Sequence, residues 1–138
     1  LVINVASLAA FAPLAGFAVY AASKAFALSL SCALAAEWED RDIRVHALCP
    51  GSVSSEFALV ASAGARKEVL HGFSARETCQ RALRKAGRGA WISLPRFNWQ
   101  LNRLAGRLFG EKVSARFAWK HLRRPHRREM ARAEGIQE

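Results

Sequence analysis

The stretch that decides the fold reads LVINV at residues 1–5, FAVYAASKAFALSLSCALAAEW at residues 17–38 and IRVHALCPG at residues 43–51. The first and third segments are short, apolar and rich in β-branched residues, as in parallel strands that are covered on both faces. The middle segment contains no Gly or Pro, so nothing interrupts a helix there. Strand, helix and strand in this order predict a βαβ unit with a right-handed crossover, and hence an α/β fold with a parallel, doubly wound sheet.

Both strands of such a unit point the same way, so their carboxyl ends lie on the same edge of the sheet. Ala6–Ser7 follows the first strand, and Pro50–Gly51 follows the second. In open α/β sheets this edge is where ligands bind, and we expect the functional site there.

Weaker signals continue the fold beyond residue 51. Residues 54–73 contain Gly64 and Gly72 and predict a loop with one short helix, which would cover a substrate. Ser74-Ala-Arg-Glu77 is a capping box that opens a helix extending to about Lys85. Residues 90–94, between Gly89 and Pro95, predict a final strand.

Composition limits the possible classes of protein. The chain has 138 residues, 51% of them hydrophobic and 23% charged, which suits one folded domain and excludes low-complexity disorder. Three widely spaced cysteines favour a reducing compartment, so we expect a cytoplasmic protein. The chain opens on an apolar run without a Met, and we expect it to be the C-terminal part of a longer protein.

The net charge of +10 belongs to the second half of the chain. Residues 1–62 hold three Lys/Arg against five Asp/Glu, whereas residues 63–138 hold eighteen against six. Two basic amphipathic helices with interleaved aromatics are predicted at about 98–109 and 111–124, separated by Gly110, before a basic tail at 126–138. We divide the chain into an α/β part, 1–95, and this extension, 96–138. The positive charge of the extension has three possible explanations. It suits a solvated surface or peripheral contact with an anionic membrane, and it suits binding to nucleic acid less well.

The apolar helix at residues 17–38 needs cover on two sides. It has no polar face, so one side would pack on the sheet and the other on a second helix or subunit, which predicts a homodimer or homotetramer. A signal peptide is disfavoured because no basic segment precedes the apolar run. A membrane span would have to bury Asn4, Pro13 and Lys24 in hydrocarbon, which is costly.

Tyr20 is the only tyrosine, and Lys24 follows it by one helical turn on the same face. An ammonium beside a phenol favours the phenolate, which can exchange a proton with an alcohol or carbonyl oxygen. Ser7, at the end of the first strand, could hydrogen-bond the same oxygen. The alternative is a packing tyrosine beside a lysine whose stem lies along apolar surface.

Three blocks resemble the second half of a short-chain dehydrogenase/reductase: Asn4-Val-Ala-Ser7, Tyr20-Ala-Ala-Ser-Lys24 and the run from Ile43 to Val53. The resemblance covers residues 1–57 in order and spacing, and extends more loosely to Pro95. It implies a Rossmann-like fold and an oxidoreductase that interconverts a carbonyl and an alcohol with NADP(H) or NAD(H). A looser resemblance to a subgroup acting on acyl or lipid-like carbonyls favours NADP(H).

The same resemblance implies a role for each site residue. Tyr20 would be the catalytic acid–base. Lys24 would favour the ionised phenol and hold the nicotinamide ribose, and Ser7 would orient the substrate oxygen. The nicotinamide end of the cofactor would be held by Tyr20, Lys24, Pro50, Gly51, Val53 and Ser55.

The sequence departs from the family pattern at Ala6, His46 and Ser55, where the family usually has Ser, Asn and Thr. The glycine-rich pyrophosphate turn and the catalytic Asn lie upstream of this segment in the family, so we expect this chain alone to bind a dinucleotide poorly and to be inactive. A non-catalytic fragment, or a basic module for binding surfaces, is the alternative function. The cysteines and histidines lack metal-ligand spacing, so no metal is expected.

Overall fold

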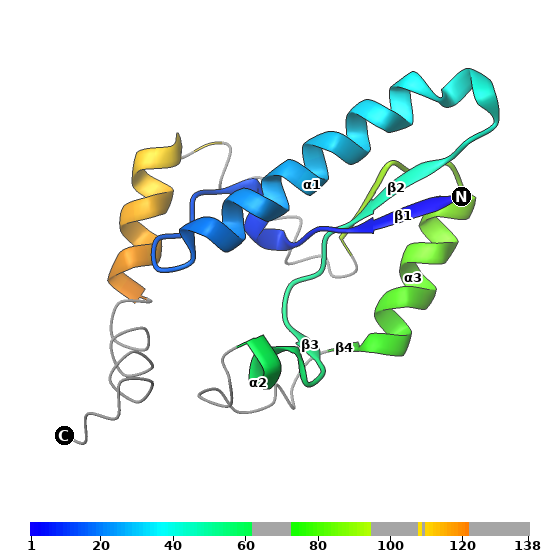
Figure 1. Cartoon of the computed structure of the whole chain (residues 1–138). Helices are drawn as coiled ribbons and strands as arrows, with labels where there is room; N and C mark the ends of the chain where they lie inside the picture. The colour runs from blue at the N-terminus through cyan, green and yellow to red at the C-terminus, as the bar shows by residue number, and fades with distance from the viewer. Residues whose placement is uncertain (62–72, 95–107, 109, 122–138) are drawn as a thin grey trace.

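The computed structural model describes residues 1–61, 73–94, 108 and 110–121. A parallel sheet of three strands has the order β1 (Val2–Val5), β2 (Val45–Leu48) and β5 (Ile92–Ser93). The long helix α1 (Ala18–Glu37) covers one face of this sheet, and α3 (Ala75–Gly87) covers the other (Figure 1). The predicted strand–helix–strand unit and the final strand are therefore confirmed.

The strand register places the two predicted strand ends together. Val2 pairs with Val45 and Val5 with Leu48, whereas Ala47 on the other side of β2 pairs with Ile92. All four residues of β2 are buried, as expected for a central strand. In β1, however, Val2 and Val5 are exposed. The expectation that both faces of β1 are covered is wrong for the described residues, because α3 packs mainly on β2 and β5 and leaves the edge strand β1 largely uncovered on that face.

The helix α1 packs on the sheet through one side only. Ala21, Ser31 and Ala35 are its buried residues. A polar bridge fixes the contact, since Asn4 Nδ2 donates to Ser31 Oγ at 3.0 Å and Ser31 Oγ donates to the carbonyl of Ala27. The opposite side exposes three large apolar side chains, Val19, Phe26 and Leu30.

By length and composition α1 could also cross a membrane, and it is the one helix of the described segments that could. A single helix of this kind is weak evidence, since the core helix of a soluble α/β domain has the same composition. In this structure α1 contacts β1 and β2, and the polar bridge joins it to Asn4. These are the contacts of a helix that packs on a sheet.

The core lies under the carboxyl ends of the strands. Ala6, Ala47, Cys49 and Leu94 form its buried centre, and Phe11 is among the half-buried residues packed around it. Phe11 belongs to a short 3₁₀ helix, η1 (Leu8–Phe11), in the segment that connects β1 to α1. Packing of η1 on the core fixes the position of the loop that begins at Ser7.

A second pair of strands lies beyond this edge of the sheet. Two short segments, β3 (Val53–Ser54) and β4 (Phe73–Ser74), pair in parallel, and the helix α2 (Phe57–Ala61) follows β3. The short helix confirms the expectation for this region, although residues 62–72 lie outside the described part. The capping box is also confirmed, because Ser74 Oγ accepts from the Glu77 amide while a Glu77 carboxylate oxygen accepts from the Ser74 amide.

His46 links the central strand to β5. It is almost completely buried, and Nδ1 hydrogen-bonds the carbonyl of Ala90 at 2.6 Å while Nε2 lies 2.9 Å from Ser93 Oγ. Because a carbonyl only accepts, Nδ1 carries a proton. The departure from the family's Asn at this position therefore creates a structural bridge, and both ring nitrogens are satisfied.

We expect His46→Ala to lower the free energy of unfolding by about 3 kcal/mol, because it leaves the Ser93 hydroxyl and the Ala90 carbonyl without partners and opens a cavity. Urea denaturation followed by circular dichroism measures the change. His46→Asn retains a donor and an acceptor and should lose less than half as much. Equal stability of His46→Ala and the parent chain would contradict the bridge.

The C-terminal extension is described only in part. Residues 110–121 are helical, and Gly110 has a left-handed φ of 72°, which fits the break predicted there. The predicted boundary at 95, nearly all of the predicted helix at 98–109 and the tail at 126–138 lie outside the described residues. The helix 110–121 lies against the N-terminal half of α1 (Figure 1), where residues of both line one groove.

Candidate active site

The loops that follow β1 and β2 are joined at the carboxyl edge of the sheet. The amide of Ala6 donates to the carbonyl of Leu48 at 2.9 Å, and the amide of Leu8 donates to the carbonyl of Pro50 at 2.8 Å. The pairing of the strands thus continues for two residues into the loops. Ser7 and the Pro50–Gly51 turn are held as neighbours by backbone bonds that do not depend on their side chains.

Ser7 is fixed by the start of η1. It is the N-cap of that helix, and its Oγ accepts from the Ala9 amide at 3.2 Å. The side chain is buried, with 8% of its surface exposed. Since this bond uses Oγ only as an acceptor, the hydroxyl proton remains available to a carbonyl or alcohol oxygen brought to this edge.

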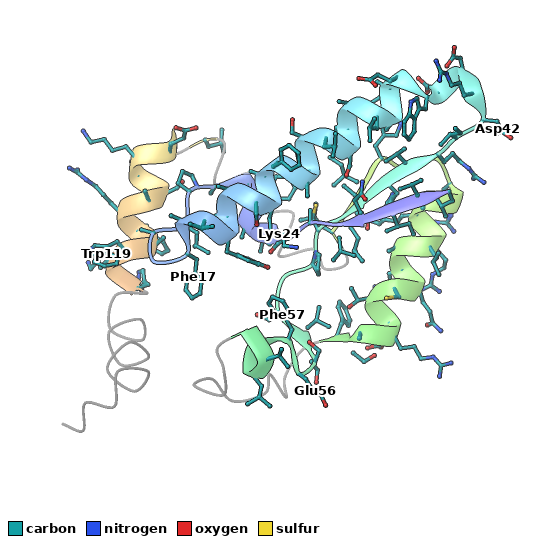
Figure 2. All side chains as sticks on the ribbon, viewed as in Figure 1. Phe17, Lys24, Asp42, Glu56, Phe57 and Trp119 are labelled. Atoms are coloured by element: carbon teal, nitrogen blue, oxygen red, sulfur yellow. The ribbon has the colours of Figure 1, made fainter. Side chains whose placement is uncertain are left out.

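Lys24 reaches across to the end of β1. Its Nζ donates to the carbonyl of Val5 at 3.0 Å, two residues before Ser7, and lies 5.8 Å from the centroid of the Tyr20 ring. The helix α1 holds both residues one turn apart on the face turned toward the sheet, and both are half-buried. Figure 2 shows Lys24 between α1 and the strand ends. The structure thus brings the ammonium, the phenol and the Ser7 strand end to one edge.

The donors at Lys24 fit a ribose diol. Among the described residues, the Val5 carbonyl takes one of the three N–H donors of the ammonium, which leaves two. The hydroxyls of a nicotinamide ribose are acceptors of the kind that these donors require. The residues present therefore fit the nicotinamide end of a dinucleotide, whereas the glycine-rich turn that would hold the pyrophosphate does not occur in this sequence.

The other predicted cofactor residues line the exit from β2. Pro50 is tied to Leu8 by its carbonyl, and Gly51 follows it at the carboxyl edge. Val53 belongs to β3 and pairs with Phe73, while Ser55 Oγ accepts from the amide of Phe57 at 3.4 Å. These residues form a continuous segment from the sheet to α2.

Phe57 is a residue of this region that sequence reasoning missed. Its ring lies 6.3 Å from the Tyr20 ring, at an interplanar angle of 43°, and it is the first residue of α2. Figure 2 shows Phe57 below Lys24, beside α2. An apolar residue in a short loop helix has no periodic signal, so only the prediction that residues 54–73 cover the substrate pointed to this region.

The remaining thiols and imidazoles do not assemble. Within the described ranges, no three His, Cys, Asp or Glu side chains come together in a way that could hold a metal ion. Cys32 and Cys79 are free thiols, and Cys49 is buried in the core below the candidate site.

Comparison with solved structures identifies the class of fold. The structure resembles a short-chain dehydrogenase from Sphingobium yanoikuyae, solved in complex with NADPH, with a TM-score of 0.61 and 28% identity over 76% of this chain and 41% of that one. It also resembles an alcohol dehydrogenase from Comamonas testosteroni specific for bulky-bulky ketones, with a TM-score of 0.53 and 26% identity over 78% and 41%. The chain therefore has the α/β architecture of a Rossmann-like fold.

Sequence comparison then gives the family. Residues 1–66 match the family model for short chain dehydrogenases. A segment of 57 residues, 41% of this chain, is 44% identical to dehydrogenase/reductase SDR family member 4 from Pongo abelii and, equally, from Homo sapiens. Residues 1–66, just under half of the chain, thus have the sequence of a short-chain dehydrogenase/reductase segment, and the part aligned with those two relatives spans about a fifth (20%) of their length.

Proposed function

We propose that this chain supplies the catalytic half of an NAD(P)(H)-dependent oxidoreductase that interconverts a carbonyl and an alcohol. The observation that carries the proposal is the position of Lys24, whose ammonium is hydrogen-bonded to the end of β1 and lies beside the Tyr20 ring. This position puts a cation between the phenol and the strand end where the substrate oxygen would lie, which is the arrangement that the proposed proton transfer requires.

Each side chain has a distinct part in the proposed reaction. Tyr20 Oη donates a proton to the substrate oxygen during reduction and takes it back during oxidation. Lys24 stabilises the phenolate that results, and its remaining N–H donors bind the ribose hydroxyls. The Ser7 hydroxyl donates a hydrogen bond to the substrate oxygen and so fixes the position of that oxygen. When bound, the dinucleotide supplies or accepts the hydride.

The edge of the sheet also sets where the cofactor and substrate would lie. Pro50, Gly51, Val53 and Ser55 would contact the nicotinamide end, because they form the segment that leaves the sheet next to Ser7. Phe57 would exclude water from the Tyr20 side, since its ring is already close to the phenol. NADP(H) is our preferred cofactor, and a lipid-like or acyl carbonyl our preferred substrate class, on the subgroup resemblance.

The proposed enzyme is a homodimer or homotetramer in the cytoplasm. The exposed side of α1, with Val19, Phe26 and Leu30, offers a surface that a second subunit would cover. Free thiols at Cys32 and Cys79 suit a reducing compartment.

A non-catalytic fragment is the competing proposal, and it is favoured by the absence of a glycine-rich turn from these 138 residues. Titration of NADPH and NADH, followed by the fluorescence of the reduced nicotinamide, separates the two. We expect weak binding and no turnover for the 138-residue chain. Restoring an upstream half should give tight binding and oxidation of NADPH in the presence of aldehydes or ketones. A restored protein that binds NADPH tightly but reduces no carbonyl would support the non-catalytic alternative.

A further inference from the structure

The helix 110–121 presents a surface that the proposed reaction does not use. Its exposed residues include three cations and three apolar side chains, and we call this set the basic–aromatic face. The face comprises Lys112, Val113, Arg116, Phe117, Trp119 and Lys120.

Groove lining and burial identify the inner side of this helix. Gly110, Glu111 and Ala115 line an apolar groove of about 720 Å³ together with residues of η1 and α1, and Ala118 is buried, with 8% of its surface exposed. Residues advance by about 100° each around a helix, so Lys112, Arg116 and Lys120 form a stripe on the opposite side. The stripe therefore faces away from the protein.

The one acidic residue of the described helix does not neutralise this stripe. Glu111 lines the groove on the inner side. It lies about 140° around the helix axis from Arg116, because successive residues advance by about 100°. The surrounding sequence adds to the positive charge, because residues 122–138 contain five arginines and three glutamates. The stripe is thus a positive surface on a chain of net charge +10.

Apolar side chains flank the stripe on both sides. Phe117 is 65% exposed and Val113 is 54% exposed on one flank, while Trp119 is 47% exposed on the other. Figure 2 shows Trp119 on the side of the helix away from α1. The Phe117 ring packs on His121 one turn later, with centroids 4.3 Å apart, which holds it in place at the surface.

We propose that the basic–aromatic face binds the surface of an anionic phospholipid bilayer, with the helix axis lying in the interface. Cations along the middle of the face would contact lipid phosphates, and the flanking aromatic and aliphatic side chains would enter the boundary with the acyl chains. This arrangement favours a membrane over nucleic acid. Contacts with the phosphates of a nucleic acid would involve the cations but not the apolar side chains of Phe117 and Val113. A second copy of this chain is disfavoured because equal stripes of positive charge repel. The proposal does not depend on the oxidoreductase function.

Co-sedimentation of the full 138-residue chain with lipid vesicles tests the proposal. We expect binding to vesicles of phosphatidylcholine and phosphatidylserine, little binding to phosphatidylcholine alone, and a decrease with added salt. Replacement of Lys112, Arg116 and Lys120 by Gln should weaken the partition coefficient on the order of a hundredfold, at about fivefold per charge. The matched control replaces two exposed arginines of α3, Arg76 and Arg84, and the arginine at its C-cap, Arg88, by Gln and should weaken it much less.

The aromatic side chains decide between membrane and nucleic acid. Phe117→Ser with Trp119→Ser, both at exposed positions, should lower vesicle binding at least tenfold while circular dichroism shows the helical content unchanged. The proposal is overturned if this variant binds vesicles like the parent, or if the α3 control loses as much binding as the variant in the stripe. Binding of duplex DNA without binding of anionic vesicles would also overturn it.

Discussion

Tyr20→Phe should abolish carbonyl reduction while leaving NADPH binding nearly intact. The substitution removes one oxygen atom and retains the ring that packs beside Phe57 and Lys24, so the local structure should survive. Loss of a positioned general acid–base costs about 10²–10⁴-fold in rate. The measurement is single-turnover oxidation of NADPH by a protein in which the upstream half has been restored, together with the NADPH dissociation constant.

Ser29→Ala is a suitable control for this experiment, because it also removes one hydroxyl from α1 but at an exposed position. It should change neither rate nor binding. Turnover by Tyr20→Phe at the parent rate would exclude the assigned role, whereas an equal loss of NADPH binding would indicate a disturbed site instead of a missing proton donor.

Lys24→Ala should lose both cofactor affinity and rate. The variant lacks the ammonium that lies beside the phenol and donates to the Val5 carbonyl, so neither the ribose contact nor the stabilisation of the phenolate remains. We expect the NADPH dissociation constant to rise about tenfold or more, as for one lost charged hydrogen bond, with a further fall in the single-turnover rate at saturating NADPH.

Two further variants make the result specific. Lys24→Arg keeps the charge and should recover part of the affinity, although its planar group fits the site differently. Lys85→Ala removes a cation from the last turn of α3, outside the candidate site, and should have no effect. Retention of both affinity and rate in Lys24→Ala would contradict the proposed function.

The sequence predicted the elements that carry strong periodic or capping signals. The helix α1 lies within one residue of its predicted limits at both ends, because no residue between Phe17 and Trp38 interrupts it. The parallel pairing of β1 with β2 followed from the length of the connecting helix, and the capping box at Ser74 fixed the start of α3. The meeting of Ser7 with the Pro50 turn is a consequence of that pairing.

Tertiary contacts determined what the sequence could not predict. The strands β3 and β4 contain two residues each, which is too short for an alternation of apolar and polar residues to be seen. The bonds of His46 to Ala90 and Ser93 join segments more than 40 residues apart, so no local pattern reports them. The spacing of Tyr20 and Lys24 predicted that they share one face of a helix. The hydrogen bond from Lys24 to the Val5 carbonyl could be seen only in the folded structure.

The position of β1 has a consequence for assembly. Within the described residues this strand has a hydrogen-bonded neighbour only in β2, so the backbone groups along its other side can receive another strand. A segment added there would lengthen the sheet next to the carbonyl that Lys24 already contacts. The same unpaired edge would let two molecules of this chain pair with each other, so a strand added there would also protect the chain from aggregation.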